Sequence, residues 1–369
     1  MSERQRSASL PLAAPPSSVC ILRLSALGDT CHVVPLIRTL QHAWPSTRLT
    51  WIIGRLEARL MNLLPDVELI VVDKRAGLSA WRDLRSRLRD RSFDVLLHMQ
   101  LALRASMLAR EVRAPVKLGF DRARARELQW LFTNAAIAPR TREHVLDSFF
   151  GFSAALGIHE RILQWDLPLP AEAQAYARAL IPDLQPTLLI SPCSSHSLRN
   201  WRPERYAAVA DHAVRAHGMR VILVGGPTVL ERRTAAEIES HARERAGLIN
   251  QVGRDTLPQL LALLARSRVL LAPDSGPVHM ATMVGTPVIG LYAATNPDRS
   301  GPYLSRRWCV NAYGRAATQF RGVAPEELRW TRKIEVPGVM DLIEVDEARG
   351  KLDELLATTG ARPPAGVPS

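Results

Sequence analysis

Cysteine is scarce in this chain of 369 residues, and the four that occur are widely separated, at Cys20, Cys31, Cys193 and Cys309. They form no C-x-x-C pair and no paired Cys/His spacing. This argues against a zinc site and a disulfide framework, and it favours reduced thiols in the cytoplasm. No apolar run approaches the ~20 residues of a membrane-spanning helix. A D-x-D pair, a Walker loop, a full G-x-G-x-x-G fingerprint and a G-x-S-x-G elbow are also missing. Kinase, NTPase, dinucleotide-binding and serine-hydrolase functions therefore lose support.

Lysine is rare too, although the chain is strongly basic. The sequence has 48 basic and 36 acidic residues, a net charge of +12, and only four of the 48 are lysine. Such an excess indicates an anionic partner, namely nucleic acid, a membrane surface or a phosphorylated substrate. A solvated surface that uses arginine in place of lysine explains it equally well. Aromatic residues make up only 5% and no helix-turn-helix or zinc module occurs, which disfavours nucleic acid.

Short apolar runs alternate with helical patterns in two successive series. Near-continuous apolar runs are typical of parallel strands buried on both faces. The predicted strands are 19–25, 49–53, 68–72 and 93–98, then 187–191, 220–224, 269–272 and 288–292. The predicted helices follow 33–40, 80–91, 204–217, 229–245, 257–266 and 346–356. A proline-rich stretch, 166–185, separates the series, while 306–333 shows no strand pattern. We expect two doubly wound α/β domains that bind ligands at the carboxyl ends of their strands, in a cleft between the domains.

The first predicted strand ends in a loop that suits either a helix cap or a catalytic carboxylate. Gly28 permits a tight turn, and Pro35 is expected near the first turn of the following helix. Asp29 or Thr30 would cap that helix through a side-chain oxygen. Alternatively, Asp29 faces the cleft as a general base. Spacing alone favours the cap.

Three loops of the second series suit an anionic ligand. Ser194 and Ser195 with Arg199 follow the first strand of that series and would make a phosphate cradle, or simply a polar loop with a solvated arginine. A further strand ends in Asp274-Ser275-Gly276 at a helix start, where free N–H groups and the helix dipole favour a diphosphate.

Two side chains beside these loops remain open to a functional or a structural role. His279 lies on the first turn of the helix after Gly276 and is either a ligand contact or a structural histidine. Glu231 lies on a helix behind Gly225-Gly226-Pro227, where it would reach a ribose hydroxyl or face water.

Taken together, these motifs resemble the ADP-heptose:lipopolysaccharide heptosyltransferases, glycosyltransferase family 9. The resemblance spans roughly residues 18–356. It is carried by S-x-x-G-D at 25–29, R-N-W-R-P-E-R-Y at 199–206, D-S-G-P-V-H-M-A at 274–281, G-T-P-V-I-G-L-Y at 285–292 followed by N-P-D-R-S-G-P-Y, and D-L-I-E-V-D-E at 341–347.

The resemblance implies the GT-B fold, an α/β architecture of two Rossmann-like doubly wound domains that face a central cleft. The acceptor-binding domain would span 18–180 and the nucleotide-sugar-binding domain 181–335. A closing helix segment, 336–358, would return to the N-terminal domain. Residues 1–17, which lack the apolar core of a signal peptide, and residues 359–369 are expected to be a disordered leader and tail.

The resemblance also implies roles for individual residues. Asp29 matches the family's proposed base. Arg199 stands where a lysine that contacts the donor diphosphate is usual, Asp274-Ser275-Gly276 replaces D-T-G, and Arg202 replaces a proline, with an effect that the sequence leaves open. The expected donor contacts are Ser194, Ser195, Arg199, Glu231, Asp274, Ser275, Gly276 and His279. The expected acceptor contacts are Ser25, Gly28, Arg104 and Arg126, whereas Arg122 and Arg124 are expected to be solvated.

The implied function is an inverting, metal-independent transfer of heptose from ADP-heptose to the Kdo/heptose inner core of lipopolysaccharide. Its partners would be a nucleotide sugar, an anionic lipid-linked saccharide and the inner-leaflet surface, without nucleic acid and without a cofactor. The protein would be cytoplasmic, peripheral at the inner face of the inner membrane. The alternatives are another donor or envelope glycan acceptor, a GT-B-shaped sugar-nucleotide epimerase or hydrolase, and a non-catalytic sugar-nucleotide-binding protein.

Overall fold

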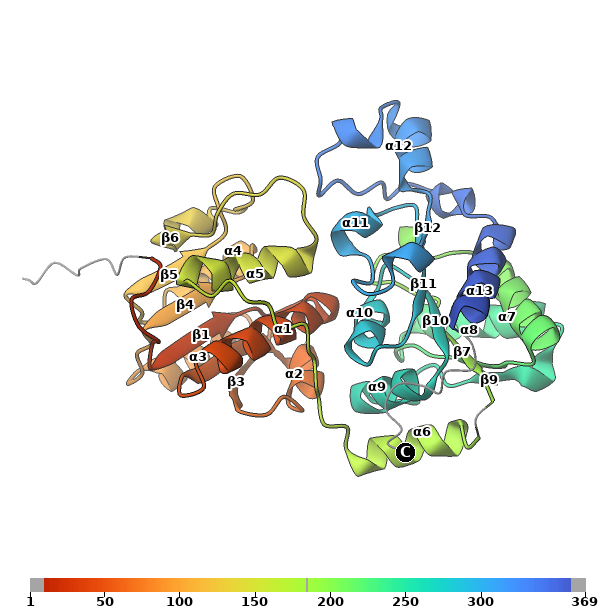
Figure 1. The fold of residues 1–369 in the computed structure, drawn as a ribbon, viewed down its shortest axis with the longest axis horizontal. Helices are drawn as coiled ribbons and strands as arrows, with labels where there is room; N and C mark the ends of the chain where they lie inside the picture. The colour runs from red at the N-terminus through yellow and green to blue at the C-terminus, as the bar shows by residue number, and fades with distance from the viewer. Residues whose placement is uncertain (1–9, 184, 360–369) are drawn as a thin grey trace, which may run out of the picture. The chain divides into compact units, whose positions relative to one another are not determined.

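The computed structural model describes residues 10–183 and 185–359, so residues 1–9 of the predicted leader and 360–369 of the predicted tail lie outside the described residues. The chain divides into two compact units, Met1–Pro168 (unit 1) and Leu169–Ser369 (unit 2). Strands and helices alternate in both, as Figure 1 shows. Among the described residues, none of the helices combines the length and apolar character needed to cross a membrane.

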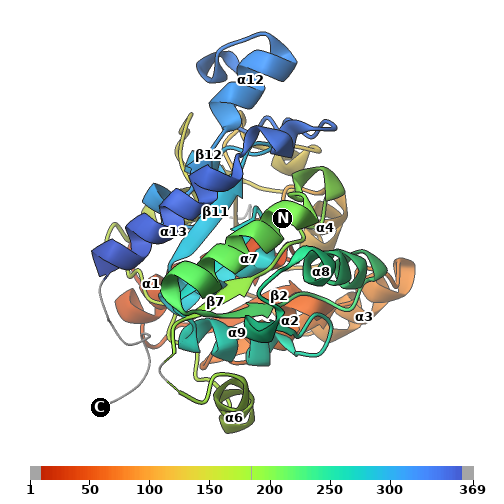
Figure 2. The same ribbon diagram turned by 90° about the vertical axis from the view of Figure 1, so that its right-hand side faces the viewer.

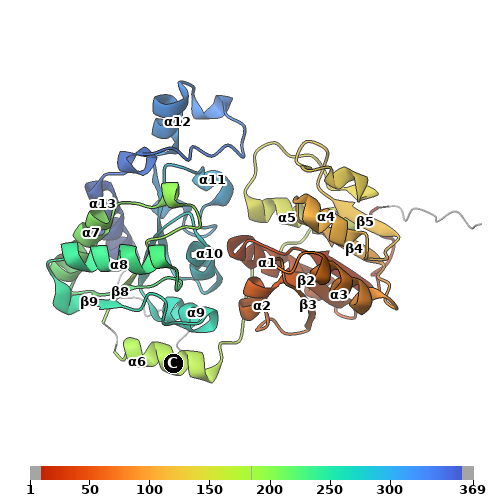
Figure 3. The ribbon, with the colours of Figure 1, turned by 180° about the vertical axis from the view of Figure 1, so that it is seen from behind.

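Unit 1 is built on one parallel sheet of six strands in the order β3-β2-β1-β4-β5-β6. Helices α3 and α4 run side by side over one face of this sheet (Figure 3), where Leu84 and Leu108 pack with Leu22 of β1. Helices α1 and α5 pack against each other. The elements are β1 Ser18–Leu22, α1 Leu27–Ala43, β2 Arg48–Gly54, α2 Arg55–Met61, β3 Val67–Val72, α3 Leu78–Leu88, β4 Val95–His98, α4 Leu103–Ala109, β5 Val116–Gly119, η1 Gln129–Leu131, β6 Ala135–Ala136 and α5 Val145–Leu156.

Unit 2 repeats the same winding in a second parallel sheet, ordered β12-β11-β10-β7-β8-β9. The described residues therefore confirm two doubly wound α/β units. The elements are α6 Ala171–Leu180, β7 Thr187–Ile190, η2 Ser197–Arg199, α7 Pro203–His217, β8 Arg220–Leu223, α8 Val229–His241, η3 Arg245–Gly247, β9 Leu248–Asn250, α9 Leu257–Arg266, β10 Val269–Pro273, α10 Gly276–Met283, β11 Val288–Tyr292, α11 Pro297–Ser300, η4 Arg306–Trp308, β12 Val310–Asn311, α12 Tyr313–Arg321, η5 Pro325–Glu327, η6 Val339–Leu342 and α13 Val345–Thr359.

The position of Pro35 differs from the prediction, because it lies well inside α1 rather than near the first turn. A proline has no N–H to donate to the carbonyl four residues earlier, which here belongs to Cys31. The indole Nε1–H of Trp165 donates to that Cys31 carbonyl at 2.9 Å. The helix continues past Pro35 because a residue distant in sequence supplies the missing donor.

The last part of the predicted leader is held against unit 1 rather than disordered. The N–H of Leu12 donates to the carbonyl of Leu156, and the Oγ1–H of Thr47 donates to the carbonyl of Pro16 at 2.6 Å. These bonds attach residues 10–17 to the end of α5 and to the start of β2.

The predicted domain limits also differ from the structure at two points. Helix α6 packs on α9 and belongs to unit 2, so the division falls after Pro168 instead of after residue 180. Helix α13, predicted to return to the N-terminal domain, lies beside α7 (Figure 2) and also contacts β11 and β12. Its apolar face, with Leu352 and Leu355, joins the core of unit 2, and this burial places the helix there.

Candidate active site

The loop after β1 places Asp29 in the first turn of α1. The N–H of Ala26 donates to Asp29 Oδ2 at 3.3 Å, which is half of a capping box, and the same oxygen pairs with the guanidinium of Arg23. The side chain of Asp29 is 32% exposed. The N-cap residue is Ala26, so the predicted N-cap role of Asp29 is wrong, and the carboxylate instead bonds back to the helix start from the third position of the helix. It still reaches solvent, which a general base requires.

Arg23, which holds Asp29, was not among the predicted site residues. This arginine lies directly after β1 and is 9% exposed. Its Nη1 donates to the carbonyl of Met99, its Nη2 contacts Asp29, and its guanidinium stacks 5.3 Å from the ring centroid of Phe149 on α5. A buried, paired guanidinium fixes the orientation of its carboxylate. The available signal was an arginine inside the otherwise apolar run V-C-I-L-R-L.

A second missed residue, Gln100, fixes the backbone of the same loop. Its Oε1 accepts the N–H of Leu24 at 3.0 Å and that of Ser25 at 3.2 Å. Gln100 follows β4, the neighbour of β1 in the sheet, so the bond joins the carboxyl ends of two adjacent strands. Ser25 is half-buried there, and Gly28 is buried in the first turn of α1.

The predicted acceptor cations lie on α4 and on the loop after β5. Arg104 in the first turn of α4 donates to the carbonyl of Lys74 at 2.6 Å, and both residues line a mostly apolar hollow of about 510 Å³. The neighbouring Leu103 N–H donates to Glu127 at 2.6 Å, which brings the exposed Arg126 segment to the start of α4.

The expectation that Arg122 and Arg124 are solvated is wrong for Arg124. Its side chain is 19% exposed and pairs with both Asp121 and Glu143. The two carboxylates flank the guanidinium because the loop after β5 folds over the start of α5. Arg122 is exposed, but its guanidinium stacks 3.6 Å from the ring centroid of Trp130.

In unit 2, Arg199 lies between two carboxylates. Its Nε and Nη2 contact Glu335 at 2.8 and 2.6 Å, and its Nη1 lies 3.5 Å from Asp274. Partial burial acts to raise the pKa of Glu335, but the bond and charge of Arg199 outweigh it and lower that pKa. Burial, followed by the charge of Arg199, lowers the pKa of nearby Lys333. Glu335 was missed because it lies 136 residues from Arg199.

The start of α10 offers polar groups for an anion. Ser275 is the N-cap residue, yet its side chain caps nothing, and its buried Oγ has no hydrogen-bond partner among the described residues. Gly276 begins the helix with N–H groups that no preceding turn uses. His279 is buried in the same first turn of the helix.

The loops after β7 and β8 are held by their own side chains. The N–H of Ser194 donates to Asn200 at 2.7 Å, and Ser195 is exposed. Glu231 accepts the N–H of Gly226 at 2.7 Å and the hydroxyl of Thr228 at 2.5 Å. Both carboxylate oxygens of Glu231 thus contribute to the shape of the glycine loop.

Arg202, whose effect the sequence left open, pairs with Asp341 through two contacts of 2.5 Å. This bond is the main cause of the lowered pKa of Asp341. The neighbouring Arg205 donates to the carbonyl of Asp341 at 3.0 Å. Both arginines therefore anchor the segment before α13 to the start of α7.

Comparisons with known proteins identify the family of the chain. The model of glycosyltransferase family 9 (heptosyltransferase) matches residues 81–328. The lipopolysaccharide core heptosyltransferase OpsX of Haemophilus influenzae is 38% identical over 340 residues, 92% of this chain and 97% of that protein.

Two solved structures show the same fold. A family 9 glycosyltransferase from Veillonella parvula superposes with a TM-score of 0.76 at 21% identity, over 96% of this chain and 100% of that one. The ADP-heptose lipopolysaccharide heptosyltransferase II of E. coli gives a TM-score of 0.70 at 18% identity, over 93% and 99%. The predicted GT-B class of two Rossmann-like domains is confirmed at the level of the fold.

Proposed function

The chain belongs to glycosyltransferase family 9 and is a glycosyltransferase of the lipopolysaccharide heptosyltransferase type, and from this membership we propose that it moves a heptose from ADP-heptose to the Kdo/heptose inner core of lipopolysaccharide. The carrying observation is the 38% identity to a lipopolysaccharide core heptosyltransferase over nearly the whole of both chains. Inversion at the anomeric carbon and independence from metal are parts of the same proposal.

Asp29 is the proposed general base. Its carboxylate would accept the proton of an acceptor hydroxyl while that oxygen attacks the anomeric carbon opposite the departing nucleotide, which inverts the centre. The Arg23 guanidinium and the Ala26 N–H support this role because both hold Oδ2 in one orientation. A positioned base contributes roughly 10²–10⁴-fold to the rate.

The proposed donor site uses fixed charges and dipoles of unit 2 to stabilise the leaving diphosphate. Its members are Arg199, Ser194, Ser195, Asp274, Ser275, Gly276, His279 and Glu231, with Lys333 beside them. A bound anion is supported by the start of α10 and by the Ser275 Oγ, which has no hydrogen-bond partner within the described part of the chain. Arg199 already contacts Glu335 and Asp274, so donor binding would exchange part of this pairing for phosphate oxygens.

The proposed acceptor site lies on unit 1, where Arg104, Arg126, Ser25 and Gly28 would meet an anionic, lipid-linked saccharide. Arg104 lines the hollow, and its guanidinium would meet an anionic group of the acceptor there. The ammonium of Lys74 pairs with Glu57 at 2.9 Å, so its charge is already compensated. Because such an acceptor is embedded in a membrane, the enzyme would work as a peripheral protein at the inner leaflet.

Replacing the proposed base tests this function directly. Asp29→Asn keeps the shape of the side chain but removes its basicity, so transfer measured with ADP-heptose and a Kdo-containing acceptor should fall roughly 10²–10⁴-fold. ADP affinity, measured by calorimetry, should stay near the wild-type value. Asp83→Asn, which alters an exposed carboxylate on α3, is the control.

Unchanged transfer by Asp29→Asn would remove Asp29 as the base. A thermal-shift screen of ADP, UDP, GDP and their sugars checks the donor, and stabilisation by a nucleotide other than ADP would contradict ADP-heptose. Release of ADP without any acceptor would instead favour the hydrolase or epimerase alternative.

A further inference from the structure

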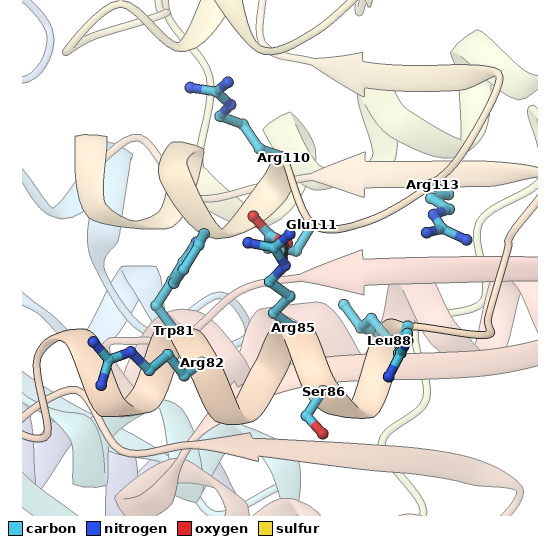
Figure 4. A pocket seen from close by; sticks show the side chains of 9 residues that line it. Trp81, Arg82, Arg85, Ser86, Leu88, Arg110, Glu111 and Arg113 are labelled. Atoms are coloured by element: carbon cyan, nitrogen blue, oxygen red, sulfur yellow. Dashed lines mark ion pairs between the residues drawn. The ribbon is translucent and has the colours of Figure 1, made fainter.

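A hollow lined mainly by arginine lies between α3 and the segment that joins α4 to β5. Figure 4 shows Arg85 of α3 reaching toward Glu111, with Arg110 and Arg113 on the opposite side. The hollow has a volume of about 660 Å³. Its lining residues are Trp81, Arg82, Arg85, Ser86, Leu88, Arg89, Arg110, Glu111 and Arg113.

Most of the positive charge of this hollow is uncompensated. Only Arg85 pairs with the single lining carboxylate, Glu111, at 3.7 Å. Among the described residues, the other four guanidinium groups have no ion-pair partner, and all four side chains are exposed: Arg82, Arg89, Arg110 and Arg113. We call these four residues and Arg85 the basic face. Such a concentration of fork-shaped donors suits phosphate oxygens.

Two further hollows continue this surface and add apolar side chains. One, of about 940 Å³, shares Arg110 and Arg113 and includes Lys117 and Leu131. The other is the hollow of about 510 Å³ beside Arg104, which shares Trp81 with the hollow of about 660 Å³. The most exposed large apolar side chains along the three hollows are Leu78, Met107 and Leu131, at 75%, 44% and 58% exposure. We call these three the apolar rim.

We propose that the basic face binds the phosphates of anionic phospholipids while the apolar rim enters the interfacial region of the bilayer. Clustered arginines attract an anionic leaflet, and neighbouring exposed apolar groups add burial that charge alone does not give. Surfaces that bind single-stranded RNA stack its bases on aromatic side chains, whereas the apolar rim is aliphatic, which favours lipid as the occupant. The inference rests on the proposed function, since it supplies the membrane contact that a lipid-linked acceptor requires.

The topology of unit 1 connects this proposed membrane contact with the proposed acceptor site. Leu78 begins α3 just after the carboxyl end of β3, at the sheet edge where the Asp29 loop and Arg104 lie. From there α3 runs toward the opposite edge of the sheet and carries Arg82 and Arg85, with Arg89 at its C-cap. The helix is about 16 Å long, because each residue adds 1.5 Å. A bilayer lying along α3 would therefore bring its surface to the proposed acceptor loops.

Vesicle sedimentation of the full chain tests the site without donor or acceptor, so its result is independent of the transferase assay. Wild type should bind phosphatidylcholine vesicles that contain phosphatidylglycerol, and high salt should weaken that binding. The triple variant Arg82→Gln, Arg89→Gln and Arg113→Gln should bind roughly 100-fold more weakly, since each arginine near an anionic surface contributes on the order of fivefold.

The matched control is Arg178→Gln, Arg321→Gln and Arg329→Gln, three exposed arginines of unit 2 that lower the net charge by the same amount. Thermal unfolding verifies that both triple variants are folded. Equal losses in the two variants, or no loss in the first, would overturn the proposal.

Two further experiments distinguish binding of lipid from binding of other anions. Leu78→Ser with Met107→Ser should weaken binding to anionic vesicles even at high salt, because the rim acts through burial. Binding of a labelled single-stranded RNA by the basic face, with no binding of anionic vesicles by wild type, would overturn the lipid assignment.

Discussion

At the scale of single residues, the decisive contact is the pairing of Asp29 with Arg23. From the sequence, an N-cap and a general base were competing interpretations of Asp29. The structure replaces the first, because Ala26 is the N-cap and Asp29 lies three residues later. Its geometry permits the second, because the Ala26 N–H and the Arg23 guanidinium share Oδ2. Arg23 acts through Asp29 and is a positioning residue.

Arg23→Lys should therefore lower kcat without weakening donor binding. A lysine keeps the charge but has no planar fork, so it cannot contact Asp29 and the carbonyl of Met99 together. We expect kcat to fall about 10–10²-fold, the scale of a small misplacement of a reacting group, with ADP affinity unchanged.

Arg161→Lys is the matched control, since Arg161 also pairs with an aspartate, Asp147, and stacks on a phenylalanine of α5, Phe150. A purely structural role of Arg23 would reduce folding and ADP binding together. An unaltered kcat in Arg23→Lys would show that the orientation of Asp29 does not depend on the planar guanidinium of Arg23.

The sequence predicted the parts of the site that rest on local motifs and missed those that rest on contacts between residues far apart in the chain. Loop motifs predicted Asp29, Ser275 and Arg199 as polar groups at strand ends, since those patterns are local. Glu335 contacts Arg199 across 136 positions and Gln100 contacts the Ser25 loop across 75, so no local pattern reports them. The functional roles of all these residues stay predictions.

At the scale of elements, α1 shows how a tertiary contact overrides a local rule. Pro35 predicted a helix start nearby, but the helix begins eight positions earlier, at Leu27. The Cys31 carbonyl that Pro35 leaves without a donor is satisfied by Trp165, 134 positions away. A proline inside a helix is therefore tolerated when another donor satisfies the carbonyl that the proline leaves without a hydrogen bond.

Trp165→Phe should destabilise unit 1 by about 1–3 kcal/mol, the cost of leaving a buried acceptor without its donor. Pro35→Ala restores a backbone N–H that can donate to the Cys31 carbonyl. The double variant should consequently lose less stability than the sum of the single changes. Urea unfolding of the four proteins measures this coupling, and additive losses would contradict the shared role of Cys31.

Short strands were among the elements that the sequence failed to predict, together with helices such as α4 and α5. β6 and β12 have two residues each and β9 has three, which is too few for an apolar run to emerge. β5 contains Lys117, whose ammonium donates to the carbonyl of Ala109 at 3.1 Å. Burial lowers the pKa of this lysine. Lys117 interrupts the apolar pattern of β5, so the sequence did not predict this buried strand.

At the scale of the whole molecule, the repetition of strands and helices sufficed to predict two doubly wound units, because eight of the strands carry short but near-continuous apolar runs. The limits of the units were harder to predict. Helices α6 and α13 have apolar faces that fit several surfaces, and only packing decides that they join α9 and α7 in unit 2. An amphipathic pattern predicts that a face is buried but does not identify its partner.

The stability of the chain should also depend on pH through Asp255, in the loop before α9. Burial raises the pKa of this carboxyl to about 7, a backbone hydrogen bond opposes the shift and Glu231 adds to it. Its Oδ2 is buried without a hydrogen-bond partner among the described residues. A carboxyl with a raised pKa favours the folded state at low pH, and that contribution disappears as the pH rises from about 4 through 7.

Asp255→Asn should therefore be more stable than wild type at pH 8, by up to about 4 kcal/mol, and nearly equal at pH 4. Asp183 is the control of opposite sign, because its bond with Arg220 lowers its pKa to about 2. Asp183→Asn should be less stable than wild type at pH 8, and this difference should disappear as the pH falls from about 4 toward 2, because the wild type then loses the contribution of the carboxylate. Urea unfolding of both variants across this range measures the difference. If Asp255→Asn shifted stability equally at pH 4 and pH 8, the cost at this position would come from the shape of the side chain and not from its charge.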